Sequence, residues 1–132
     1  MELVYNARLM KELTGSMRII LLAAAALNTL GAITFCPLFP DLLQRANLPA
    51  APPAYLWMFS IWILIFGLGY LWLALSRTFD RTFIATSAAG KLTFSIVIVA
   101  FAAMGQLPSS AITSGIGDLV FGSIFVFWLL RK

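Results

Sequence analysis

Three strongly polar side chains stand inside stretches of sequence that are mostly apolar: Asn28, Lys91 and Asp118. An isolated charge at the centre of a bilayer costs about 2.5–3.5 kcal/mol on insertion scales, so such residues usually face other helices or a polar cavity. A lysine side chain is long enough to reach an aspartate on a neighbouring antiparallel helix. The sequence therefore predicts a buried Lys91–Asp118 pair, with Asn28 as a further hydrogen-bonding partner.

Three interpretations of these residues stay open from the sequence. The leading one is an ion pair that locks two helices together, with Asn28 bonded across a helix interface. The second is a functional site for a proton, an ion or the polar head of a ligand. In the third, Lys91 is unpaired and extends its ammonium to the cytoplasmic surface.

The aromatic residues between positions 54 and 76 offer a second candidate site. Trp62 and Phe66 are one helical turn apart, and with Tyr70 they could line an apolar groove for a lipophilic ligand. The favoured alternative is ordinary packing or lipid contact. Trp57 and Trp72 fall near the ends of the same stretch, where interfacial aromatic residues gather.

The chain lacks the residue combinations of common catalytic chemistry. It contains no histidine and a single cysteine, Cys36, which excludes an intramolecular disulfide, a histidine-based triad and a Cys-x-x-Cys site. Cys36 is either a reactive thiol or, as we prefer, a small buried hydrophobic residue. Cys36, Asp41, Lys91 and Asp118 are the residues that could take part in acid–base or nucleophilic chemistry. We therefore expect a non-enzymatic protein with no cofactor and no metal ion.

Composition predicts the elements that position these side chains. Hydrophobic residues make up 61% of the 132-residue chain and charged residues only 11%, whereas an average soluble domain carries about 25% charged residues. A hydrocarbon core is crossed by about 20 helical residues, and a lipid-exposed segment must be helical to satisfy its backbone. The expected fold is an all-α, four-helix transmembrane bundle in one domain over 1–132, with spans at about 18–36, 54–76, 82–104 and 110–130.

Basic residues predict the orientation of the bundle. They stand before and at the start of the first span, between the second and third spans, and after the fourth, whereas the opposite side carries only Arg45. Lys and Arg gather in cytoplasmic loops, so both termini are expected to be cytoplasmic. The net charge of +4 then reflects topology, and no nucleic-acid partner is expected.

Three connecting segments have their own predictions. Residues 2–14 resemble a short interfacial helix, with apolar residues on one face. A short helix can begin at Pro40 or Asp41 and run to Arg45. The proline-rich stretch over 47–53 is expected to be extended.

Several short motifs follow one another along most of the chain, from about residue 18 to 130. They are Ala25, Leu27, Asn28 and Gly31; Phe39-Pro40-Asp41-Leu42; Gly67-Leu68-Gly69-Tyr70 and Ala74; Gly90-Lys91; Gly105-x-Leu107-Pro108; and Gly117-Asp118 with Phe121 and Phe125. In this order they resemble a family of small, functionally uncharacterised bacterial four-helix inner-membrane proteins, loosely similar to DoxX-like proteins. The resemblance implies four helices in a bacterial inner membrane and no particular activity.

Two functions are carried forward. The leading one is an accessory or scaffold subunit of a membrane complex, or a small homo-oligomer, with membrane lipids and a protein partner around it. The alternative is a small transporter or lipophilic-ligand-binding protein that uses Lys91 and Asp118 together with the aromatic residues at 62, 66 and 70.

Overall fold

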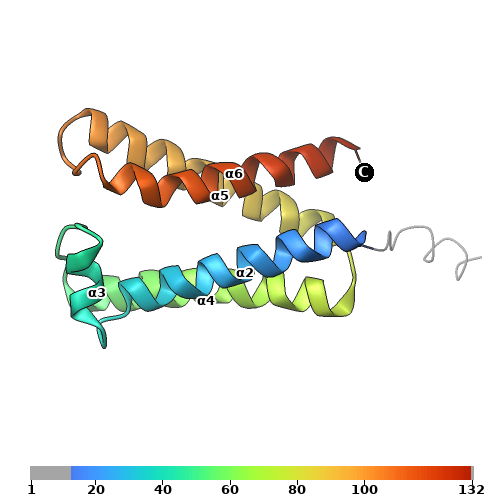
Figure 1. The fold of residues 1–132 in the computed structure, drawn as a ribbon, viewed down its shortest axis with the longest axis horizontal. Helices are drawn as coiled ribbons and strands as arrows, with labels where there is room; N and C mark the ends of the chain where they lie inside the picture. The colour runs from blue at the N-terminus through green and yellow to red at the C-terminus, as the bar shows by residue number, and fades with distance from the viewer. Residues whose placement is uncertain (1–12, 132) are drawn as a thin grey trace, which may run out of the picture.

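The computed structural model describes residues 13–131, and Figure 1 shows them as a bundle of helices. The helices are α2 (Gly15–Phe35), α3 (Pro40–Arg45), α4 (Pro53–Ser76), α5 (Arg81–Ala103) and α6 (Ala111–Arg131). Within this part of the chain, α2, α4, α5 and α6 are long and apolar enough to cross a membrane. The predicted all-α four-helix membrane fold is confirmed, and the chain is an integral membrane protein.

The first span begins three residues earlier than predicted because Thr14 caps it. The Thr14 hydroxyl accepts a hydrogen bond from the backbone N–H of Met17 at 3.3 Å, which satisfies one of the free donors of the first turn. The helix ends at Phe35, and Cys36 is extended with φ −68° and ψ 124°. Pro37 accounts for this ending, since the residue before a proline is disfavoured in helical conformation.

The connection between α2 and α4 follows the prediction over most of its length. The short helix α3 begins at Pro40, which was one of the two predicted starting residues. The extended segment is shorter than predicted at both ends. Asn47 adopts a left-handed turn with φ 53°, and Pro53 is already the first residue of α4. Proline suits this position because its fixed φ is helical and the first turn needs no N–H donor.

The predicted interfacial helix over 2–14 lies outside the described residues except for its last two positions. Leu13 and Thr14 are not helical. Leu13 donates its backbone N–H to the carbonyl oxygen of Arg77 at 3.1 Å. This bond ties the start of α2 to the end of α4.

The four long helices form two antiparallel hairpins, α2 with α4 and α5 with α6, each packed along its length (Figure 1). The hairpins meet at the end of the molecule that carries the described chain ends and diverge toward α3. Their meeting point is a buried core in which Tyr70 and Phe125 are 1% and 0% exposed, with ring centroids 5.5 Å apart. The rest of this core consists of Met17, Leu21, Ala24, Ala25, Leu73, Ala74, Ile84, Ala88 and Trp128.

The α2–α4 hairpin depends on a close approach at Gly67. A Cβ atom there would stand 3.1 Å from the Cβ of Asn28 and 3.5 Å from the backbone oxygen of Ala25. Neither atom can move without moving α2. A Cβ at Gly90, in contrast, would meet nothing within 4 Å.

These two glycines make a matched pair for a stability measurement. We expect Gly67→Ala to destabilise the fold by about 1 kcal/mol through overpacking. Gly90→Ala should stabilise it by about 0.5–1 kcal/mol, because alanine has less conformational freedom to lose in the unfolded chain. Equilibrium unfolding in mixed micelles measures both. Equal effects of the two substitutions would contradict the close approach of α2 and α4.

Candidate functional site

A cleft of about 370 Å³ opens between the two hairpins. It extends from Leu48, which follows α3, to Tyr70 and Ser87 at the core where the hairpins meet. All four long helices contribute to its walls, which are mostly apolar. The lining residues are Leu27, Asn28, Leu30, Gly31, Thr34, Phe35, Ala46, Leu48, Phe59, Trp62, Ile63, Phe66, Tyr70, Ser87, Gly90, Lys91, Phe94, Ser114 and Asp118.

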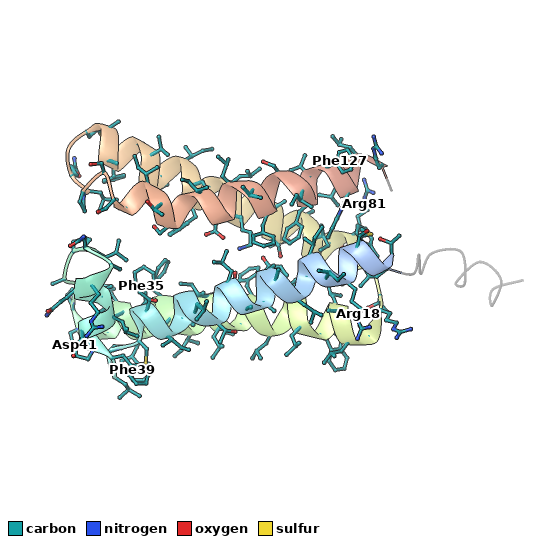
Figure 2. The ribbon with its side chains drawn as sticks, viewed as in Figure 1. Arg18, Phe35, Phe39, Asp41, Arg81 and Phe127 are labelled. Atoms are coloured by element: carbon teal, nitrogen blue, oxygen red, sulfur yellow. The ribbon has the colours of Figure 1, made fainter. Side chains whose placement is uncertain are left out.

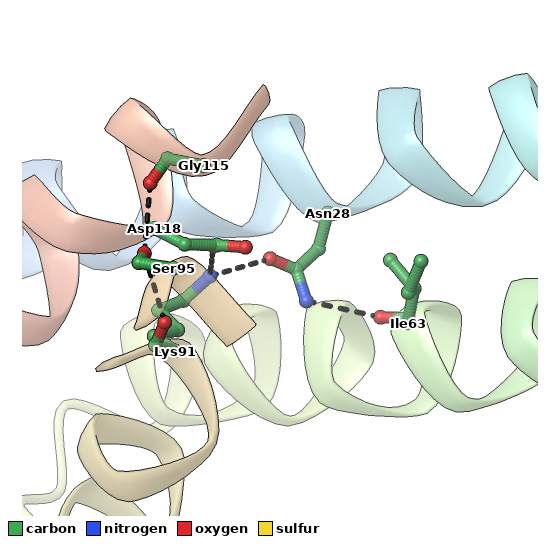
Figure 3. Close-up of polar contacts among 6 residues, drawn as sticks. All are labelled: Asn28, Ile63, Lys91, Ser95, Gly115 and Asp118. Atoms are coloured by element: carbon green, nitrogen blue, oxygen red, sulfur yellow. Dashed lines mark hydrogen bonds and ion pairs between the residues drawn. The ribbon is translucent and has the colours of Figure 1, made fainter. Parts of the chain in front are cut away.

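The three polar residues singled out in the sequence meet at this cleft (Figure 3). Lys91 Nζ forms an ion pair with Asp118 Oδ1 at 2.5 Å and donates a hydrogen bond to Asn28 Oδ1 at 3.0 Å. The side chains of Lys91 and Asp118 are 7% and 21% exposed. The expected pairing is therefore present. The interpretation in which Lys91 reaches the cytoplasmic surface is wrong, because its ammonium is bound inside the bundle.

The network continues from Lys91 into the other hairpin through Asn28. Asn28 Nδ2 donates to the carbonyl oxygen of Ile63 at 3.0 Å. One polar chain, from Ile63 through Asn28 and Lys91 to Asp118, thus joins α4, α2, α5 and α6 (Figure 3). It is the polar counterpart of the apolar core and links the hairpins where they begin to diverge.

Two cation–π contacts and a serine hydrogen bond also stabilise the buried ammonium and its helix. Lys91 Nζ lies 5.4 Å from the ring centroid of Tyr70 and 5.9 Å from that of Phe121, within range of a cation–π attraction. Ser95 donates to the carbonyl oxygen of Gly115 at 2.8 Å, one turn from Lys91 on α5. This bond holds α5 and α6 in register beside the ion pair.

Ser87 adds a polar group that sequence reasoning did not single out. Its side chain lines the cleft and the residue is 1% exposed. Its Oγ is buried and has no partner at ordinary hydrogen-bond distance among the described residues, and the Tyr70 hydroxyl is the polar group that interacts with it. The signal that could have found Ser87 is its position one helical turn before Lys91, on the same face of α5.

The aromatic residues of α4 that line the cleft differ in how deeply they are buried. Trp62 is 60% exposed, Phe66 is half-buried, and Tyr70 is fully buried at the deep end. Two phenylalanines that sequence reasoning passed over complete the wall. Phe59 and Phe94 face each other from α4 and α5 with ring centroids 6.0 Å apart. Phe59 lies three positions before Trp62, a spacing that places it on the same helical face.

The other candidate reactive groups are not part of this site. Cys36 is a partly buried free thiol at the end of α2. Asp41 lies in the first turn of α3, at the end of the molecule remote from Arg18 and Arg81 (Figure 2). Neither lines the cleft. Within the described residues, no three His, Cys, Asp or Glu side chains lie close enough to hold a metal ion.

The arrangement combines a polar floor with apolar walls that open between helices. Pockets of this kind bind molecules with a polar head and an apolar body, because a few placed polar groups orient a ligand that is otherwise held by apolar contact. Comparison of the chain with models of known protein families, with characterised proteins and with solved structures gave no match.

Proposed function

We propose that this integral membrane protein binds a lipophilic ligand in the cleft between its two hairpins. The observation that carries the proposal is the position of the Asn28–Lys91–Asp118 network on the floor of an apolar cleft. A purely structural ion pair needs no cleft above it. Here Lys91 and Asp118 line the cleft, and the Asp118 side chain is 21% exposed, so a ligand's polar head can contact the pair.

This function ranks above the accessory-subunit role because a specific feature supports it. The exposed faces of the long helices are apolar, as contact with lipid requires. The accessory-subunit role would apply if a helix of a partner protein occupied the cleft instead of a small ligand. We place transport below binding, since the packed core closes the end of the cleft at Tyr70 and Phe125.

We also propose that the protein lies in a bacterial inner membrane with both termini cytoplasmic. The basic residues Arg18, Arg81 and Arg131 lie at one end of the bundle (Figure 2 labels Arg18 and Arg81), and Arg77 joins them at the end of α4. The resemblance to bacterial four-helix inner-membrane proteins supports the same location. Reporter fusions at residue 132 and in the loop after Gly105 test it: only the C-terminal fusion should give cytoplasmic reporter activity.

Photolabelling tests ligand binding directly. The purified protein, reconstituted in nanodiscs, is irradiated with an alkyl amphiphile that carries a diazirine at mid-chain. We expect labels on cleft residues such as Phe59 and Phe94, in amounts that saturate with probe concentration. Labelling spread over the lipid-facing residues Ile96 and Val99, growing in proportion to probe, would mean that the cleft does not bind the amphiphile.

A further inference from the structure

We infer that the ligand of the cleft is an amphiphile whose head group is uncharged and accepts hydrogen bonds, as an ester or ketone carbonyl does. This inference rests on the proposed function and specifies the class of molecule bound at the same site. Three features of the floor carry it: its balance of charge, its free hydrogen-bond donors and the apolar walls above it.

The charges on the floor are already balanced. Lys91 and Asp118 are the charged side chains that line the cleft, and they are paired with each other at 2.5 Å. An anionic head would either displace Asp118 from Lys91 or add a net negative charge to apolar surroundings, and a cationic head would do the reverse. Both outcomes leave an uncompensated charge at low dielectric, which is strongly unfavourable. An uncharged head avoids the penalty.

Unused N–H donors remain on this floor beside the balanced charges. A lysine ammonium has three N–H donors, and Lys91 uses two of them on Asn28 and Asp118. The Asn28 amide has two N–H donors and gives one to Ile63. The Ser87 hydroxyl does not add to them, because it is buried beside Tyr70. An uncharged head group with a hydrogen-bond-accepting oxygen can take up the remaining N–H groups of Lys91 and Asn28 without disturbing the ion pair.

The walls suit the apolar body of such a ligand. Above the floor, the paired rings of Phe59 and Phe94 bridge α4 and α5, and Phe35 packs edge-on against Phe59 at 4.6 Å. The cleft continues past them to Leu48 without another charged side chain. An alkyl chain rising from the floor would therefore remain in apolar contact along its length.

A matched series of twelve-carbon amphiphiles tests the head group. Methyl dodecanoate, dodecanesulfonate, dodecyltrimethylammonium and dodecane compete with the photolabel in nanodiscs at equal mole fractions in the lipid. We expect the neutral ester to compete about tenfold more strongly than any of the other three. Stronger competition by the sulfonate or the ammonium compound overturns the inference while leaving the cleft a ligand site. Equal competition by dodecane would show that the floor does not contribute to binding, and it would also overturn the inference. Absence of saturable labelling contradicts the proposed function itself.

Two variants separate the floor's chemistry from its shape. Asp118→Asn keeps the size of the side chain and an oxygen for Lys91 but leaves the floor with one positive charge. The ratio of sulfonate to ester affinity should then rise about tenfold or more. Ser87→Ala is the matched control: its hydroxyl is buried beside Tyr70, so its loss should leave the advantage of the ester over dodecane unchanged. An unchanged head-group preference in Asp118→Asn overturns the inference.

Discussion

Replacing Asp118 with leucine is expected to destabilise the folded protein by about 3 kcal/mol, and replacing Lys91 with methionine in the same chain to restore most of that loss. The single variant leaves the Lys91 ammonium at the cleft floor with only Asn28 and the faces of two aromatic rings as partners. The double variant removes both charges and nearly keeps the volume of both side chains. Breaking a buried pair is costly because the remaining charge is uncompensated, whereas removing both members is close to neutral.

Unfolding titrations in mixed micelles on both single variants and the double variant complete a double-mutant cycle. Asp41→Asn is the control, since Asp41 is an exposed carboxylate on α3 and its replacement should change stability by less than about 0.5 kcal/mol. If the double variant is as unstable as Asp118→Leu alone, the two charges do not interact in the folded state. The pair would then not be the link between α5 and α6 that the geometry indicates.

Filling the cleft from α5 is expected to abolish ligand binding without unfolding the protein. Gly90 lines the cleft, and a Cβ added there meets nothing within 4 Å, so Gly90→Phe can place its ring in the cleft without a backbone clash. The ring occupies the space in which the alkyl chain would lie beside Phe94. Saturable photolabelling should fall at least tenfold, because a steric block acts on the bound state alone.

Val99→Phe is the matched control for the filled cleft. Val99 lies on the same helix, is 50% exposed and is absent from the cleft lining, so the same aromatic ring there enters lipid. Both variants should unfold at wild-type denaturant concentrations. Retained labelling of Phe59 in Gly90→Phe would show that ligands do not use the cleft, and equal loss in both variants would show that the effect is not specific to it.

Several features of the fold could be predicted from the sequence because they depend on local rules. Span lengths follow from the thickness of the hydrocarbon core, and their helical form from the lack of water to satisfy backbone groups. Pro37 and Pro40 mark helix boundaries through steric rules that involve only their neighbours. The pairing of Lys91 with Asp118 was also predictable, since a charge buried in lipid requires a partner and the short turn between α5 and α6 makes the two helices neighbours.

The sequence offered the neighbours of that pair as candidates, and only the tertiary structure showed that they meet at one cleft. Asn28 reaches Lys91 from the other hairpin, and Trp62, Phe66 and Tyr70 line a cleft that continues to the same floor. A helix that is apolar on nearly every side does not reveal which face it turns inward, because lipid and protein interior are equally compatible with those residues. The divergence of the hairpins depends on close contacts such as Gly67 against Asn28, which join residues far apart in the chain. The polar residues and their need for a partner are thus properties of the sequence, whereas the cleft above them arises from the packing of two hairpins.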